Sequence, residues 1–242
     1  MKIVSKSDVG RVRRSNQDSY AAGELPGGVG WAVVCDGMGG ANGGNIASAT
    51  AVKMISETIS SSYREGMGAN SIRTMLQSAV YAANVSIFDM AKSVDSLAGM
   101  GTTVVAAVLS DGYAHIVHAG DSRAYRIRGE EITQITKDHS IVQNMVENGQ
   151  LTADEARYHP RKNVITRALG VEETLEVEYN EIELCGEDVL LICTDGLTNY
   201  LDTEDILQII REHSFYDYPE CMIAEANSNG GGDNITVVVI TQ

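Results

Sequence analysis

Four aspartates stand at the ends of apolar segments, each next to a glycine or one residue from it. Asp36 follows "WAVVC" and Asp195 follows "VLLICT", while Asp121 follows "IVHAG" and Asp233 precedes "NITVVVI". One such aspartate is most simply a turn former. Four of them are better explained if the strand ends meet at one edge and form a single acidic pocket. Converging buried carboxylates repel one another, and a bound cation relieves that repulsion.

The oxygen ligands in this set indicate which cation would bind. Carboxylates select Mg²⁺, Mn²⁺ or Ca²⁺ rather than zinc. The glycines after Asp36 would leave room for ions and substrate, because they add no side chain to the site. The sequence therefore predicts a divalent metal site built from aspartates.

The glycine-rich stretch "AVVCDGMGGANGG" at 32–44 could instead bind a nucleotide. However, position 45 is Asn where a P-loop has Lys, and the run from Gly37 lacks the third glycine of a dinucleotide fingerprint. The chain also lacks C-x₅-R, D-x-D and G-x-S-x-G motifs, and its five histidines have no zinc-ligand spacing. The absence of these motifs weighs against a nucleotide-binding enzyme, which stays as an alternative.

The segment "GRVRRSNQDSY" adds Arg11, Arg13 and Arg14, followed by Asp18. For Arg11 and Arg14 the simplest interpretation is a solvated turn. One arginine near acids and metals would bind phosphate, because its planar guanidinium matches two phosphate oxygens. Metals combined with one arginine are typical of phosphoryl-group hydrolysis.

Composition limits the class of protein. The chain has 242 residues, 43% of them hydrophobic, and a formal net charge of −15. That charge argues against binding to nucleic acid or to an anionic membrane surface. We find no signal peptide and no apolar run long enough to span a membrane. The four cysteines form no C-x-x-C pair and are predicted to be buried free thiols, which indicates a cytoplasmic protein.

The positioning elements follow from apolar periodicity. Strands are predicted at 2–7, 29–35, 102–109, 113–119, 122–128, 187–193 and 234–241, with turns at 110–112 and 128–130 closing hairpins. Helices are predicted at about 44–62, 70–93, 141–149, 203–212 and 218–228, with Thr203 as an N-cap. This order indicates an α+β fold, most simply a sandwich of two antiparallel sheets with helices outside. The polar segment 139–170 is predicted to be a helical insertion such as a flap.

Six segments in order resemble the successive motifs of one enzyme family. They are "RVRRSNQD", "AVVCDGMGG", "GTTVVAAVL", "HAGDSRAY", "CTDGLTNYL" and "GGGDNITVVVI". Together they resemble the metal-dependent Ser/Thr protein phosphatases of type 2C, the PPM family, in their compact bacterial form. The resemblance covers about residues 7–241. It implies one catalytic domain over 1–242, with a four-layer α-β-β-α sandwich flanked by helix pairs and a flap at about 139–170.

The resemblance also implies roles for individual residues around two Mn²⁺ or Mg²⁺ ions. Asp36 would bridge both ions and the Gly37 carbonyl would bind one of them. Asp195 and Asp233 would supply further carboxylates, and Asp121 with Asp195 would hold a third, weaker ion. The remaining roles are phosphate binding by Arg13, orientation of metal-bound water by Asp18, and support of the site by Asn234.

Under this resemblance, a hydroxide shared by two metals attacks the phosphorus of phosphoserine or phosphothreonine directly. The expected partners are phosphoprotein substrates, including a bacterial Ser/Thr kinase that the enzyme opposes. We expect a monomer that binds neither nucleic acid nor membrane. Two alternatives stay open: a catalytically weak member that acts as a phosphoprotein-binding regulator, and a phosphatase for small phosphate esters.

One position departs from the pattern of animal members of the family. They often have a histidine, proposed as the general acid, where this chain has Met38. A thioether cannot donate a proton, so metal-bound water or another residue would protonate the leaving group. His159 in the predicted flap is a candidate, although a lone histidine is more often structural.

Overall fold

The computed structural model describes the backbone of residues 1–242 and every side chain except those of Ala41 and Asn42. The strands are β1 Lys2–Asp8, β2 Asp18–Leu25, β3 Val29–Met38, β4 Gly101–Thr102, β5 Val104–Ser110, β6 Tyr113–Ala119, β7 Arg123–Arg128, β8 Glu131–Gln134, β9 Glu178–Glu183, β10 Val189–Cys193 and β11 Ile235–Thr241. The helices are α1 Gly40–Ser62, α2 Ala69–Ser93, α3 Ile141–Glu147, α4 Ala153–Arg157, α5 Asp195–Thr198, α6 Thr203–Glu212 and α7 Tyr218–Ser228, with short 3₁₀ turns at Asp95–Leu97 and Phe215–Asp217.

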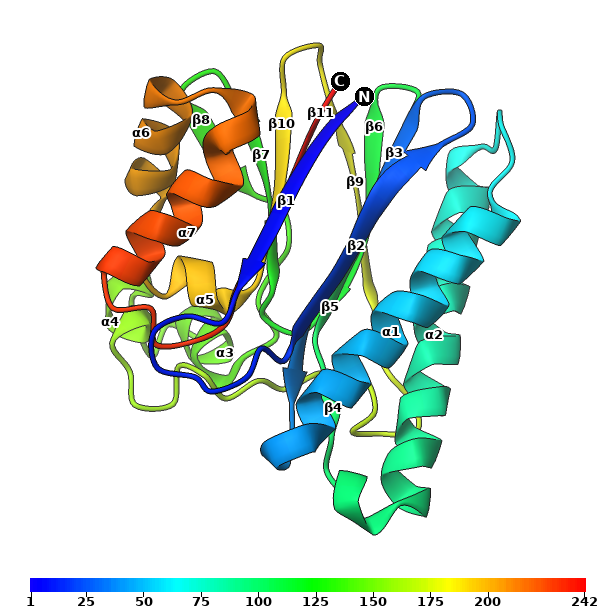
Figure 1. Ribbon diagram of the computed structural model, residues 1–242, viewed down its shortest axis with the longest axis vertical. Coiled ribbons are helices and arrows are strands. Elements are labelled where there is room, and N and C mark those ends of the chain that lie inside the picture. The colour runs from blue at the N-terminus through cyan, green and yellow to red at the C-terminus, as the bar shows by residue number, and fades with distance from the viewer.

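Two antiparallel sheets lie face to face between two helix pairs (Figure 1). One sheet has the order β1-β11-β10-β7-β8, and the other has the order β2-β3-β5-β6-β9 with β4 paired to β3. Helices α1 and α2 cover the second sheet, whereas α6 and α7 cover the first (Figure 1). The predicted α+β sandwich in four layers is therefore confirmed.

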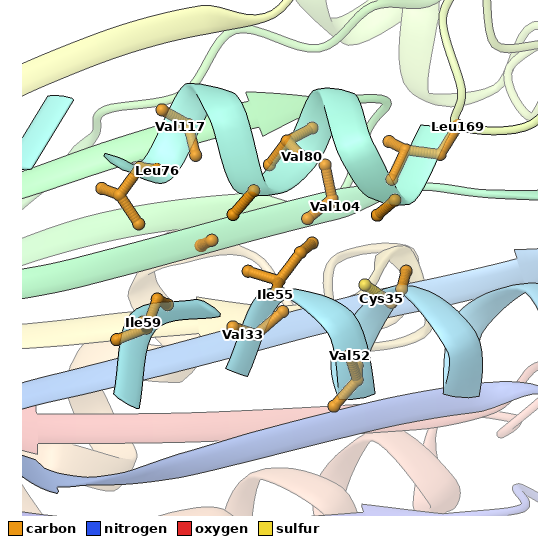
Figure 2. Close-up of a cluster of buried hydrophobic side chains, with 14 of the residues drawn as sticks. Val33, Cys35, Val52, Ile55, Ile59, Leu76, Val80, Val104, Val117 and Leu169 are labelled. Atoms are coloured by element: carbon orange, nitrogen blue, oxygen red, sulfur yellow. The ribbon is translucent and has the colours of Figure 1, made fainter. Parts of the chain in front are cut away.

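Strand alternation divides the core into three apolar layers. Odd-numbered residues of β3, such as Val33, pack with Ile55 of α1 and Leu76 of α2 (Figure 2). A second layer joins β10 and β11 to α6 and α7. The third lies between the sheets and contains even-numbered residues of β3, such as Val34, with Ile192 of β10. The central strands are thus anchored on both faces.

Several elements differ from the sequence prediction. Apolar periodicity does not predict strands β2, β8 and β9 or helices α4 and α5, and α1 begins at Gly40 rather than near 44. The N-cap of α6 is Asp202, not Thr203: its carboxylate accepts from the backbone of Glu204 and Asp205, and the Asp205 carboxylate accepts from the Asp202 backbone. The two predicted hairpins are confirmed, with Ser110 paired to Tyr113 and Arg128 to Glu131.

The cysteines are free, as predicted, but they are not all buried. Cys35 and Cys193 are buried in strands, Cys221 is half-buried, and Cys185 is exposed in the turn after β9. The apolar pattern around Cys185 ends one residue earlier, at the buried Leu184. In the part of the chain that the structure describes, no helix combines the length and apolarity needed to cross a bilayer.

Candidate active site

The apolar layer between the sheets becomes polar at one end. On β3, Asp36 continues the face formed by Ala32 and Val34, and the register pairs Asp36 with Asp18 of β2. Neighbouring strands and the segments that flank them bring further polar residues to this end of the sandwich. These are Thr103, Ser122, Thr194, Asn234 and Thr236, all of them buried. The fold therefore collects polar groups from distant segments at one edge.

Asp18 is buried and held by two hydroxyl groups. Its Oδ2 accepts from Thr236 Oγ1 at 2.7 Å and from Thr194 Oγ1 at 2.9 Å. Burial raises the pKa of Asp18 to about 7, although these two hydrogen bonds act in the opposite direction. A carboxylate held this way has a fixed orientation and a free second oxygen.

Asp121 is buried at the same edge, and Asp36 and Asp195 are half-buried there. Burial raises the pKa of Asp36 well above its ordinary value, and neighbouring carboxylates, Asp18 first, raise it further. The pKa of Asp121 is raised by burial and then by Asp195. Burial and Asp233 raise the pKa of Asp195, while hydrogen bonds with Asp36 and Asn199 offset part of that effect. Unneutralised carboxylates are therefore unstable here.

Asp233 is half-buried, and Arg13 faces it. The Arg13 guanidinium donates to Asp233 Oδ2 at 2.7 Å, with side chains 51% and 26% exposed. Coulombic attraction to Asp36 and Asp195 also raises the pKa of Arg13, after the larger effects of Asp233. Arg13 thus points at the acid cluster, whereas Arg11 and Arg14 are exposed, as predicted.

Asn234 holds the loop that carries Arg13. Its side-chain amide accepts from the Gln17 backbone at 2.8 Å and donates to the carbonyls of Val9 and Ser15 at 2.9 and 3.0 Å. All three partners lie in the connection from β1 to β2. Asn234 therefore sets the position of Arg13 relative to β11.

The glycines after Asp36 and Asp195 allow close backbone contacts. A Cβ on Gly37 would lie 2.1 Å from the Gly44 carbonyl oxygen, and one on Gly196 would lie 1.9 Å from that of Asn234. Gly37 thus lets the first turn of α1 pack against the end of β3, and Gly196 lets α5 pack against β11. We expected the glycines after Asp36 to leave space for ions and substrate, but at Gly37 that space is occupied by backbone.

Asp195 begins α5 and borders a cleft of about 590 Å³. Its Oδ2 accepts from Asn199 Nδ2 at 2.9 Å, and Lys162 Nζ donates to Asn199 Oδ1 at 2.9 Å. The 139–170 segment forms one wall of this cleft through α3 and α4, and α5 and α6 form the other. His159 is not among the residues lining this cleft, and its Nδ1 accepts from the Arg161 backbone at 3.1 Å.

A second group of potential ligands lies at the same end of the sandwich, and sequence spacing did not reveal it. Side-chain ligand atoms of His118, His139 and Glu178 all lie within 4.8 Å of one another. Gly120 donates to His139 Nδ1, while His139 Nε2 lies 3.0 Å from Glu178 Oε1 and 2.9 Å from Arg167 Nη1. Arg167 also reaches Glu178, at 3.2 Å. This guanidinium already neutralises Glu178, so the group is better explained as an ion-paired network.

The aspartate cluster, in contrast, fits a hard divalent cation. Among the described side chains, Asp18 Oδ1 and Asp195 Oδ1 are buried without any hydrogen-bond partner. Such atoms are costly unless a ligand or water binds them. The donors are carboxylate oxygens, which Mg²⁺ and Mn²⁺ prefer.

Comparisons with known proteins agree with this geometry. The family model for protein phosphatase 2C matches residues 11–226. A serine/threonine phosphatase stp from Listeria innocua is 36% identical over 239 residues, covering 97% of this chain and 93% of the relative. The Streptococcus agalactiae serine/threonine phosphatase structure has a TM-score of 0.93 at 34% identity, covering 100% of this chain and 99% of that one.

A further structure, the catalytic domain of the serine threonine protein phosphatase PstP in complex with two manganese ions, has a TM-score of 0.87 at 33% identity. It covers 98% of this chain and 96% of that chain. These matches span nearly the whole sequence, and they agree with the order of motifs from Arg11 onward. The chain therefore belongs to the protein phosphatase 2C family.

Proposed function

We propose that this member of the family is a metal-dependent phosphatase that removes phosphate from phosphoserine and phosphothreonine in proteins. Asp36, Asp195, Asp233 and the Gly37 carbonyl would hold two Mn²⁺ or Mg²⁺ ions. Asp121, together with Asp195, would hold a third ion more weakly. The opposing partner would be a Ser/Thr kinase that acts on the same substrates, and the 139–170 segment would be a flap over the cleft.

The observation that carries this proposal is the pair of buried oxygens without partners, Asp18 Oδ1 and Asp195 Oδ1, inside a cluster of aspartates whose pKa values are raised. Without cations this arrangement is unfavourable, because buried carboxylates repel each other. The manganese complex of the related PstP domain supports the choice of ion.

Bound divalent cations would supply Lewis acidity and would make water nucleophilic near neutral pH. The chain's own residues then orient the substrate. Arg13 would exchange its contact with Asp233 for two phosphate oxygens, because guanidinium binds phosphate in a bidentate manner. Asp18, held by its two threonine hydroxyls, would accept a hydrogen bond from the attacking water through its free Oδ1. Met38 cannot protonate the leaving alkoxide, so that proton would come from water.

The test is hydrolysis of a phosphothreonine peptide with and without Mn²⁺, by the native chain and by Asp233→Asn. We expect activity only with metal, and a loss of at least about 100-fold in kcat/KM in the variant, as typical for loss of a group that stabilises charge in the transition state. Circular dichroism checks that the variant is folded.

Each outcome has a distinct meaning. Activity without metal, or near-native activity of Asp233→Asn, would contradict the dinuclear assignment. A folded native chain that binds the phosphopeptide but hydrolyses nothing with any divalent ion would support the phosphoprotein-binding regulator instead. Faster hydrolysis of small phosphate esters than of every phosphopeptide would redirect the substrate class.

A further inference from the structure

A second cavity, of about 600 Å³, opens beside Met38, between α2 and the segment 165–176. We call it the Met38 groove. Its apolar lining includes Met38, Tyr81, Val171 and Leu175, and its polar lining includes Glu172. Tyr81 is 42% exposed and Val171 is 50% exposed, which is high for large apolar side chains. The groove thus presents apolar surface to solvent.

The groove is held open by specific contacts. The buried Asn84 of α2 accepts from the Gly170 backbone at 2.8 Å and donates to the carbonyls of Glu172 and Glu173 at 3.1 Å. Leu169 and Thr102 exchange two backbone hydrogen bonds. These bonds fix the 169–173 turn against α2 and β4. A preformed groove costs little conformational entropy when a ligand binds.

The groove begins next to the candidate active site. Met38 follows Asp36 by two residues on the same strand and the same face. Two strand positions span about 7 Å. A peptide whose phosphate lies at the aspartate cluster would therefore reach the groove within about two or three residues of the phosphorylated one.

The charge of the groove indicates what it would bind. Its lining carries Glu172 and Glu176, with Glu173 adjacent in the chain. Arg167 also lines it, but its guanidinium is already paired with Glu176 at 2.6 Å and with Glu178. Among the residues described, Glu172 and Glu173 form no ion pair. An apolar groove with two unpaired carboxylates beside it is complementary to an apolar side chain next to a lysine or arginine.

We propose that the Met38 groove is a substrate-recognition site for a peptide segment that carries an apolar residue adjacent to a basic one, within about three residues of the phosphorylated residue. This inference rests on the proposed phosphatase function and adds a sequence preference to it. Tyr81 and Val171 contact the apolar side chain, and Glu172 pairs with the basic one.

The experiment compares two pairs of phosphothreonine peptides and p-nitrophenyl phosphate at saturating Mn²⁺. The peptides of a pair differ only in carrying Leu–Lys or Ala–Gln within three residues of the phosphothreonine. One pair carries these residues before the phosphothreonine and the other pair after it, whereas p-nitrophenyl phosphate has no flanking residues. The groove variants are Tyr81→Ala and Glu172→Lys. Their matched controls are Tyr113→Ala, which changes a tyrosine 41% exposed in β6, and Glu187→Lys, which changes an exposed glutamate in the turn before β10.

The native chain should prefer one Leu–Lys peptide over its Ala–Gln partner by about fivefold or more in kcat/KM, and each groove variant should remove most of that preference. Hydrolysis of p-nitrophenyl phosphate should not change, and both controls should behave like the native chain. No preference in the native chain, or an equal loss on p-nitrophenyl phosphate, would overturn the proposal.

A binding measurement separates this inference from the catalytic one. Fluorescence anisotropy of the labelled peptides with the native chain in EDTA reports recognition without turnover, because the proposed hydrolysis needs metal. A preference for binding the Leu–Lys peptide supports the groove proposal even if no substrate is hydrolysed. Absence of hydrolysis would contradict only the proposed phosphatase function. Equal binding of both peptides would overturn the groove proposal whatever the activity.

Discussion

Among single residues, Arg13 has the clearest testable role, because its guanidinium faces the aspartate cluster and lies half exposed on Asp233. Replacing it with Ala removes the only side chain of its loop that pairs with a predicted metal ligand, as far as the described contacts show. We expect Arg13→Ala to raise the KM for a phosphopeptide about tenfold or more, since a charged hydrogen-bonding partner of the phosphate is lost. Steady-state kinetics with Arg13→Lys as the conservative control checks this.

The stability of the Arg13 variant should change little. The ion pair with Asp233 is partly solvent-exposed, with the Arg13 side chain 51% exposed, and such pairs contribute about 0–1 kcal/mol. Urea unfolding should therefore show nearly the same midpoint for native and variant chains. If the KM stays unchanged in Arg13→Ala, a different residue binds the phosphate.

Helices and strands position the residues of the candidate site through close backbone contacts, and Gly44 of α1 is an example. A Cβ on Gly44 would lie 2.7 Å from the carbonyl atoms of Gly37 and 2.9 Å from the Met38 nitrogen. Gly44→Ala must therefore push α1 away from the end of β3, at a cost of about 1–3 kcal/mol for overpacking. Because Gly37 directly follows Asp36, activity should fall together with stability.

Chemical denaturation measures the effect of Gly44→Ala, with Gly186→Ala as its control. A Cβ added to Gly186 would meet no atom within 4 Å, and this glycine has no positive φ, so its replacement should be neutral. An unchanged unfolding midpoint in Gly44→Ala would mean that α1 moves freely relative to β3.

The same elements show what the sequence could and could not predict. Strand β3 begins as a continuous apolar run, so its existence was predictable. Its end was not, because the strand continues past Asp36 to Met38, where Gly37 and Met38 pair with β4. Strand β2, "DSYAAGEL", lacks that pattern, and its conformation depends on an eight-residue ladder with β3. Strand β9, "EYNEIE", is an acidic edge strand, whose charges are a common protection against aggregation but hide the strand signal.

For the candidate site, the aspartates could be predicted from the sequence, but the residues that hold them in place could not. Asp36, Asp121, Asp195 and Asp233 could be selected because carboxylates at strand ends have a recognisable local context. The threonines that hold Asp18 lie more than 170 positions along the chain, and nothing local marks them. The network of His118, His139 and Glu178 likewise exists only after β6 and β9 pair. The family assignment was predictable because six motifs in order carry long-range information.

At the scale of the whole molecule, the aspartate cluster couples stability to pH and to metal. The pKa of Asp18 is raised to about 7, and the pKa values of Asp36 and Asp121 are raised well above the ordinary range. An acid with a raised pKa holds its proton more tightly in the folded state. Its contribution to stability is therefore present at low pH and is lost as pH rises towards the folded-state pKa.

Three histidines change the stability of the folded state in the opposite direction below about pH 6.5. Burial lowers the pKa values of His115, His118 and His139 below 6.5, so these residues favour the folded state increasingly as pH rises to that value. Well above pH 6.5 their contribution is constant, and the aspartates alone decide the slope. The informative window therefore begins near pH 6.5 and covers the pKa of Asp18, which is raised to about 7.

We expect the melting temperature of the EDTA-treated chain to fall between about pH 6.5 and 8, because the folded state must lose the proton of the buried Asp18, which the unfolded state has already lost. Mn²⁺ at about 100 times its Kd should add roughly 2.7 kcal/mol, or about 5–10 °C for a chain of this size. This gain should be larger at the higher pH, since protons and metal compete for the same oxygens. Asp36→Asn, which removes a carboxyl surrounded by the other aspartates, should flatten the pH slope and reduce the gain. A metal-free chain that becomes more stable over this pH range, or an equal Mn²⁺ gain in Asp36→Asn, would show that the cluster is not the shared site of protons and metal.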